Sequence, residues 1–398
     1  ASAVCTSAPA MAERRRIVEP PVEIRQRRWG GLHPGQVVAA EAAVVAAAAG
    51  SRSPWPVLLP VVLATAAVLA CCFVRLRGRW LYEWLGTALR YLVRTRAGTL
   101  DEQRPVDGVL AATTHGGALR RLEIDGAEVA VLTDSTGYTA VLEVVPDGAD
   151  PAGGQRLLPP LGELLPHNEP GDVPISVQVV THTVPAPSVA AADDAAAHSY
   201  RELGGGQIPS RRRTWLCVQA MHSAEVPTPR AVEQALINAV RRIQRRMRKS
   251  GFRPRVRSVR ETAADLLGLV RVDPGQPADG PAVRERWGRW TAGRATHVTY
   301  RVSGWPALAD RAAAGPLIDG IDSVPATSRT SSLAGRRVGE LVDVEAVLRF
   351  TTAEGAGQRA VDDALGALLR GSGAVLQRLD GDHRFGVGAT LPTGGFAV

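Results

Sequence analysis

The chain has 398 residues, with 47 Lys and Arg against 39 Asp and Glu, which gives a net charge of +8 and a pI near 10. That length exceeds one average domain and leaves room for a membrane segment beside one or two globular cores. The four cysteines show no metal-type spacing, so the sequence supports neither a zinc site nor a disulfide framework.

Residues 1–35 form a basic tail that we expect to lie in the cytoplasm. Met11, followed by Ala-Glu-Arg-Arg-Arg, is a candidate start residue. No apolar stretch precedes a small-residue cleavage site in this tail, so we do not expect a cleaved signal peptide.

Residues 36–75 predict a two-helix transmembrane hairpin. Two apolar runs, 36–49 and 57–74, are separated by a short segment rich in Ser and Pro. The second run has 18 residues and no charge, which as a helix spans about 27 Å, close to the thickness of a bilayer core. Arginines gather on both outer flanks while the connecting loop holds only Arg52. The positive-inside rule therefore predicts a multi-pass protein of the plasma membrane with both termini in the cytoplasm.

Glu41 lies within the first apolar run. A carboxylate inside a membrane span indicates a functional group such as a proton relay or an interhelical bond. The alternative is a glutamate near the cytoplasmic interface, solvated or paired with arginine. We favour this alternative, because nothing else in the two runs could complete a proton path.

Residues 76–96 predict an amphipathic juxtamembrane helix. Its apolar residues recur every three or four positions, and its Trp and Tyr side chains suit the depth of lipid headgroups. We expect it to lie along the membrane or to pack on a partner helix. The residues expected at this interface are Arg75, Arg77, Arg79, Trp80, Leu81, Tyr82, Trp84 and Leu85.

The segment Arg77-Gly78-Arg79-Trp80-Leu81-Tyr82-Glu83-Trp84-Leu85, directly after the predicted hairpin, resembles the EccE family. That family is a membrane core component of actinobacterial type VII (ESX) secretion systems. The resemblance implies a non-catalytic structural subunit that braces the secretion complex at the cytoplasmic membrane. It also implies partnership with the lipid bilayer and with the other core subunits EccB, EccC (the ATPase) and EccD. The family offers no catalytic motif to carry over, so we expect no cofactor and no catalytic residue.

The rest of the chain predicts a cytoplasmic, layered α/β region with a mixed sheet, in two parts, 97–272 and 273–398. Helices are expected at 161–165 (a single turn), 190–203, 230–249, 261–269 and 358–369. Strands are expected at 128–133, 137–145, 174–184, 214–222, 253–259, 285–291, 295–302, 342–351 and 374–379. The segments 230–236 and 359–365 are alike, and each falls between strand-like runs. They suggest a strand–helix–strand pseudo-duplication.

No P-loop (Walker A) motif is present, because Lys249 is the sole lysine and no Gly-Lys-Ser/Thr sequence contains it. A motor would have to be another subunit. Asp380-Gly381-Asp382 has the Asp-x-Asp form with which metal-dependent glycosyltransferases hold a cation. It therefore leaves open a membrane-tethered, glycosyltransferase-like enzyme with Asp380 and Asp382 as metal ligands. An ordinary turn explains the same tripeptide, and we favour it.

The run Arg241–Lys249 is strongly basic. It leaves open a membrane-bound regulator that binds nucleic acid. No aromatic residues alternate with the arginines, so we favour a solvated helix face or an acidic protein partner. We expect no nucleic acid partner.

Overall fold

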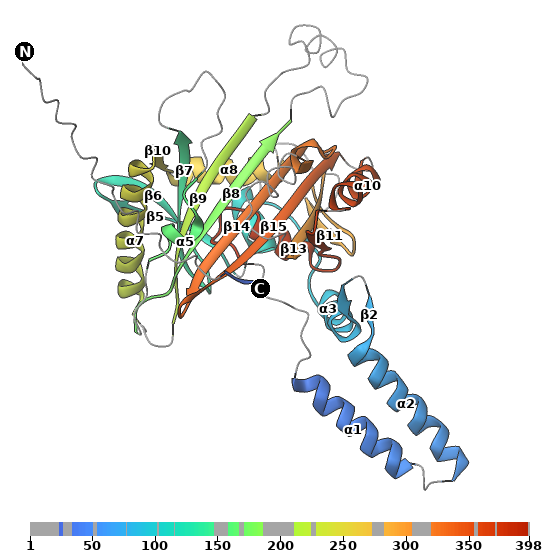
Figure 1. The fold of residues 1–398 in the computed structure, drawn as a ribbon. Helices are drawn as coiled ribbons and strands as arrows, with labels where there is room; N and C mark the ends of the chain where they lie inside the picture. Colours follow the sequence, from blue (N-terminus) through green and yellow to red (C-terminus); the bar gives the residue numbers. More distant parts are fainter. Residues whose placement is uncertain are drawn as a thin grey trace, which may run out of the picture.

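The computed structural model describes residues 24–26, 34–50, 54–76, 78–101, 103–114, 116–146, 158–166, 171–185, 211–223, 228–272, 282–304, 320–353, 357–370 and 372–396. Within these residues one 14-stranded sheet forms the body, and a helical arm projects from one edge of it (Figure 1). The expected helix at 190–203 lies outside the described residues.

The sheet has the strand order β4-β11-β12-β13-β15-β14-β8-β9-β7-β6-β5, with β10 beside β7, β16 beside β13 and β1 beside β15. Every pairing is antiparallel except the parallel pair β1–β15. The strands are β1 (Ile24–Gln26), β4 (Ala97–Gly98), β5 (Ala118–Ile124), β6 (Ala127–Thr133), β7 (Gly137–Pro146), β8 (Ile175–Val184), β9 (Arg211–Met221), β10 (Phe252–Val256), β11 (Val283–Arg286), β12 (Arg289–Ala292), β13 (Ala295–Gly304), β14 (Ser328–Val338), β15 (Leu341–Ala353) and β16 (Val375–Arg378).

The two halves of the sheet repeat one topology and meet at the β8–β14 pair. In the first half β9 lies between β7 and β8 and is followed by a helix and by β10, which returns to β7. In the second half β15 lies between β13 and β14 and is followed by a helix and by β16, which returns to β13. The similar segments 230–236 and 359–365 open these two equivalent helices, α7 (Pro229–Lys249) and α10 (Gln358–Leu369).

Helices cover both faces of the sheet. Alternate strand residues point to opposite faces, so each strand feeds two cores. One face carries α7, whose Leu236, Val240 and Ile243 pack on Leu216 and Val218, and also α10. The other face carries α4 (Pro105–Thr113), α8 (Val259–Val270) and α11 (His383–Ala389) around Trp215 and Trp290. The short helix α5 (Leu161–Leu164) packs at the edge of the first core.

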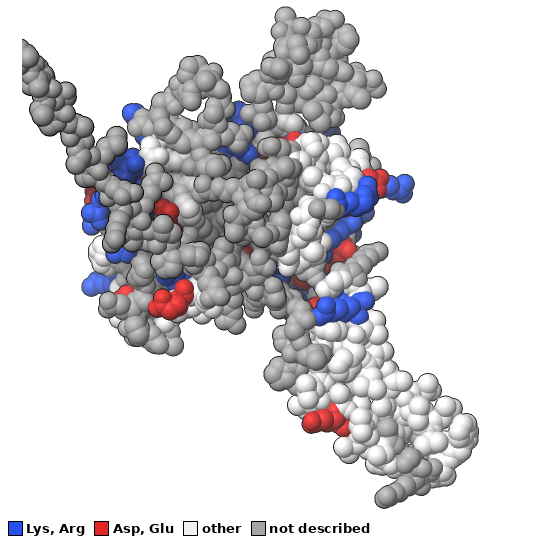
Figure 2. Space-filling model, in the orientation of Figure 1, with Lys and Arg blue, Asp and Glu red and all other residues white. Residues whose placement is uncertain are grey.

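The arm contains α1 (Pro34–Gly50) and α2 (Trp55–Phe73), which lie side by side (Figure 1), and then α3 (Leu81–Val93). A hydrogen bond of 2.6 Å from Gln36 Nε2 to the carbonyl of Cys72 ties the start of α1 to the end of α2. Figure 2 shows the surface of this pair as almost free of charge, and its large apolar residues are exposed.

The expected fold class is wrong in two respects. No helix within the described ranges combines the length and the apolar character that crossing a bilayer requires. α1 has 17 residues, and α2 has 19 with Pro60 inside it. The predicted two-helix transmembrane hairpin at 36–75 is thus contradicted, and the multi-pass topology that rested on it loses its basis. The body is a large antiparallel sheet with helices on both faces, and not a mixed-sheet α/β region.

Candidate functional site

The site with the most unusual chemistry is the junction where α3, the last helix of the arm, meets the sheet body (Figure 1). After α2 the chain forms a small two-stranded ribbon, β2 (Arg75–Leu76) with β3 (Arg79–Trp80), in which Arg75 lies opposite Trp80. The Arg75 guanidinium lies 3.9 Å from the centre of the Trp80 ring, and Arg79 and Trp80 are buried. This ribbon turns the chain sharply into α3.

Aromatic stacking holds one side of α3 against the turn between β11 and β12. The Trp84 ring stacks on Trp287 with 5.9 Å between centroids, and Tyr91 meets the same ring edge-on at 5.3 Å. Trp84 Nε1 donates to the carbonyl of Leu76 at 2.9 Å, which fixes the indole against the ribbon. Trp287 is therefore the surface on which α3 is seated.

Charged and polar groups also hold α3 at the turn Asp380–Asp382. Asp382 accepts a hydrogen bond from Thr87 Oγ1 at 3.2 Å and pairs with Arg94 at 3.4 Å. Arg94 also pairs with Glu285 at 2.7 Å and donates to the carbonyl of Gly381. These ion-pair side chains are at most 15% exposed, so solvent screens them less than surface pairs.

Gly381 is required at the centre of this turn. Its φ is +77°, a conformation that side-chain-bearing residues rarely adopt. A Cβ added there would lie 2.8 Å from Thr87 Cγ2 and 2.8 Å from the Trp287 ring. The backbone of Gly381 also donates to the carbonyl of Trp287 at 2.7 Å. The turn thus works as a close-fitting socket for α3.

Asp380, the other carboxylate of the motif, serves a different set of partners. It pairs with Arg378 at 3.0 Å and lies 3.6 Å from His383 Nε2, while His383 Nδ1 contacts Thr299 Oγ1 at 2.9 Å. The order Thr–His–Asp is that of a nucleophile, a base and an orienting acid. However, Thr299 and His383 are fully buried and Asp380 is 5% exposed, so no substrate reaches them. Burial also lowers the pKa of His383, which keeps its imidazole neutral.

Asp380 and Asp382 are both engaged with arginines. Among the described residues no three His, Cys, Asp or Glu side chains are grouped as a metal ion would need. The structure gives the two carboxylates a role in holding α3 and α11, and the turn alternative accounts for their positions.

Electrostatics at the junction are set by burial. Burial raises the pKa of Glu285 above its ordinary value, although the backbone N–H of Arg384 and the Arg94 guanidinium oppose this. Burial lowers the pKa of Arg384, and the nearby positive charge of Arg94 lowers it further. Arg94 and Arg384 therefore both contribute positive charge on this side of α3.

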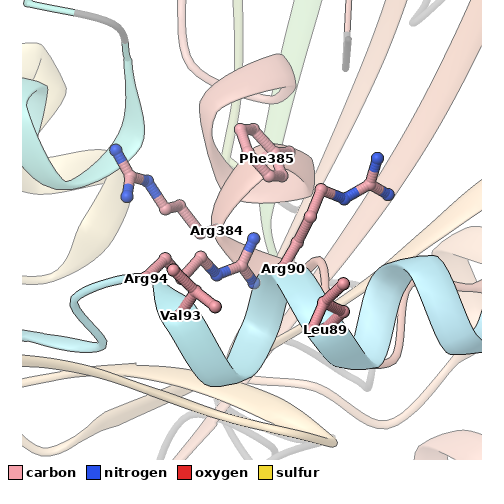
Figure 3. Close-up of a pocket in the computed structure, with 6 residues that line it drawn as sticks. All are labelled: Leu89, Arg90, Val93, Arg94, Arg384 and Phe385. Atoms are coloured by element: carbon pink, nitrogen blue, oxygen red, sulfur yellow. The ribbon is translucent and has the colours of Figure 1, made fainter.

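An open groove separates α3 from α11 beside these guanidiniums (Figure 3). It is lined by Leu89, Arg90, Val93, Arg94, Arg384 and Phe385. The Arg94 guanidinium lies 5.2 Å and that of Arg384 lies 5.8 Å from the centre of the Phe385 ring. A second groove on α3 is lined by Leu76, Trp84, Leu85, Ala88 and Trp287.

The expected interface residues, which follow α2 along the chain and extend into α3, differ in burial. Arg79 and Trp80 are buried, Leu81, Tyr82 and Trp84 are partly buried, and Leu85 is exposed. Arg75 is exposed, Arg77 lies outside the described residues, and Glu41 is exposed on α1. Their roles in contact with a membrane remain predictions. The sequence pattern did not single out Arg94, Glu285, Trp287, Arg384 or Phe385.

The basic run on α7 lies apart from this junction, on the helix that covers the first half of the sheet. Its apolar stripe is buried, while Arg242, Arg245 and Arg246 are exposed. Arg241 pairs with Asp125 at 2.7 Å across the surface.

Comparison with known proteins gives one result. Residues 208–302 match the family model described as "Putative type VII ESX secretion system translocon, EccE". The matched region runs from β9 through α7 to β13 and includes Glu285 and Trp287 of the junction. It confirms, from a separate part of the chain, the resemblance found at residues 77–85. No curated protein matches the chain.

Proposed function

We propose that this member of the EccE family is a non-catalytic structural subunit that braces the type VII secretion complex at the membrane. The family match makes the chain a component of that secretion system. A translocon component works in association with a membrane. The structural role, the bracing and the identity of the neighbouring subunits are our proposal.

The observation that carries the proposal is the seating of α3 on the sheet body. A stacked aromatic pair, a buried arginine with two carboxylates and a glycine socket hold one helix in place. That helix connects an apolar helical arm to the large sheet. A joint of this kind transmits position and force between two parts, which is what a brace requires.

The side chains of the junction favour a structural role over catalysis. Its acids are engaged with Arg94 and Arg378, and its one buried histidine has no access to solvent. A glycosyltransferase-like enzyme would need Asp380 and Asp382 free to hold a cation. The partners that we propose, from the resemblance to the EccE family, are EccB, EccC and EccD, with EccC as the ATPase.

Affinity purification of the tagged full chain from its native host, in mild detergent, tests this role. We expect the ATPase and the channel subunit to co-purify with the wild-type chain. Gly381→Ala, which unseats α3, should lower their recovery. Gly339→Ala is the matched control, because Gly339 has a φ of +62° but no atom within 4 Å of an added Cβ. Recovery of the wild-type chain as a lone monomer would contradict the proposal.

A further inference from the structure

The groove between α3 and α11 has the size and the lining of a ligand site (Figure 3). Its volume is about 490 Å³, within the range of roughly 300–1,000 Å³ that small-molecule sites occupy. One part of its lining is cationic, from Arg90, Arg94 and Arg384. The other part is apolar, from Leu89, Val93 and Phe385. A ligand that fills it must therefore be both anionic and apolar.

Positive charge exceeds negative charge at this groove. Two carboxylates, Glu285 and Asp382, face the three guanidiniums, and both are paired with Arg94. Arg90 reaches only within 3.8 Å of Asp382, and its side chain is 68% exposed. The Arg384 guanidinium donates to the carbonyl of Ala111 at 3.3 Å and, among the described residues, has no carboxylate within 4 Å. Arg384 is thus available for an anion. Arg90 also donates to Thr87 Oγ1, but at 3.5 Å, so its contacts with Thr87 and Asp382 are both long. A phosphate suits guanidinium donors.

The apolar part of the groove opens onto an uncovered apolar stripe of α3. Leu89 is 64% exposed and Val93 is 81% exposed, and Leu85 and Leu92 continue the stripe along the same helix. A free phosphate would leave these side chains in water. An alkyl chain attached to the phosphate would cover them, and burial of apolar surface favours that arrangement.

We propose that this groove binds an anionic phospholipid, with its phosphate held by the arginines of the lining, Arg90, Arg94 and Arg384, and an acyl chain along Leu89, Val93 and Phe385. The choline of a zwitterionic lipid would bring a positive charge toward the three guanidiniums, so an anionic headgroup is preferred. α3 lies between the exposed apolar arm and the sheet, so a lipid here would meet the apolar surface at its inner end (Figure 1). This site is independent of the secretion role, because lipid alone suffices to fill it.

Native mass spectrometry of the detergent-solubilised full chain, titrated with phosphatidylglycerol and with phosphatidylcholine, tests the proposal. We expect the wild-type chain to retain phosphatidylglycerol preferentially. Arg90→Gln/Arg384→Gln should weaken that retention roughly tenfold or more, since each arginine near an anionic lipid contributes about fivefold. Arg242→Gln/Arg245→Gln on α7 removes the same charge from an exposed surface elsewhere and should change retention less than about twofold.

Two further experiments distinguish a phospholipid from free phosphate as the occupant of the groove. Leu89→Ser/Val93→Ser should weaken binding of long-chain phosphatidylglycerol while leaving its preference over phosphatidylcholine. Inorganic phosphate at millimolar concentration should not displace the lipid. Equal retention of the two lipids by the wild type, or equal losses in the two arginine double variants, would overturn the proposal. So would displacement by phosphate, or loss of co-purified protein subunits without loss of lipid from Arg90→Gln/Arg384→Gln.

Discussion

The sheet body and the helical arm use the same amphipathic pattern in opposite ways. In the body, α7 buries its apolar stripe completely, with Leu236 and Val240 at 0% exposure. In the arm, α3 has apolar residues at similar spacing, yet Leu89 and Val93 are exposed while Thr87 and Arg94 contact the sheet body. The docked side of α3 combines these polar groups with the rings of Trp84 and Tyr91, and the aliphatic stripe is left uncovered. An amphipathic pattern thus specifies which residues share a face, and the partner decides which face is covered.

This difference in burial predicts different roles for the two regions. The body buries its apolar side chains between the sheet and the helices on both of its faces. The arm presents apolar surface outward and is held by a small number of specific contacts. Stability should therefore depend on the body, and association should depend on the arm.

A leucine-to-alanine substitution should give the largest difference in the free energy of unfolding between the two regions. Leu236→Ala removes a fully buried side chain and should lower the free energy of unfolding by about 2–5 kcal/mol. Leu89→Ala on α3 should change it by less than about 0.5 kcal/mol, because that side chain is mostly exposed. Denaturant unfolding of the two full-length variants measures both values. Similar losses would show that the exposed stripe of α3 is covered within the protein itself.

Acid should destabilise the body through two histidines of the sheet, His182, which is partly buried, and His297, which is fully buried. Burial is the main cause that lowers the pKa of His182 to about 3 and the pKa of His297 well below 6.5, and the charge of Arg349 adds to it. The unfolded chain therefore binds more protons than the folded chain from about pH 6.5 down to the folded-state pKa. The free energy of unfolding should fall as pH drops through that window, by up to about 1.4 kcal/mol per pH unit for each histidine.

Unfolding curves between pH 7 and pH 4 measure this effect. His182→Gln/His297→Gln should be less sensitive to acid than the wild type over that range. A double variant with an unchanged pH dependence would show that other groups cause the acid sensitivity.

The joint between the regions can be broken at one residue. Gly381→Ala should cost about 1–3 kcal/mol locally, since its Cβ would meet Thr87 and Trp287 and its φ is positive. Hydrogen exchange should then rise in residues 81–93 while residues 229–249 keep their protection. Gly339→Ala shares the strained φ without the contacts, and it should leave the exchange of α3 as in the wild type. Unchanged protection of α3 in Gly381→Ala would mean that the socket does not hold it.

The smallest effect should come from an exposed ion pair of the body. Arg241→Gln removes the pairing with Asp125, in which both side chains are more than 40% exposed. The free energy of unfolding should fall by less than about 1 kcal/mol, and less still at high salt. A loss well above that value, measured by the same unfolding curves, would show that the pair is coupled to the core.

Local patterns predicted most elements of the body. The apolar stripe that begins at Val232 predicts α7, and alternating runs predict β7, β8, β13 and β15, all of which the structure confirms. β14, which contains Ser331 and Ser332, was not predicted because its sequence is polar, yet pairing on both sides buries much of it. The expected strand at 285–291 is wrong: it is the hairpin of β11 and β12, which turns at Trp287 and Gly288.

Local sequence patterns did not predict two features of the structure correctly. The apolar runs at 36–49 and 57–74 predict helices correctly, but no described helix is both long and apolar enough to cross a membrane. The socket joins Thr87 to Asp382 across 295 positions of sequence, so no spacing rule finds it. Asp380-Gly381-Asp382 was noticed as a motif in the sequence. Only the fold shows that this turn contacts α3.

The central claim is that α3, seated on the Asp380–Asp382 turn, couples the arm to the sheet for secretion. Export of type VII substrates from a host strain whose only copy carries Gly381→Ala tests it most directly, with Gly339→Ala alongside. The account predicts that export is lost in the Gly381→Ala strain, although the protein accumulates at the wild-type level, and is kept in the Gly339→Ala strain. Normal export from a strain in which hydrogen exchange shows α3 to be released would contradict it.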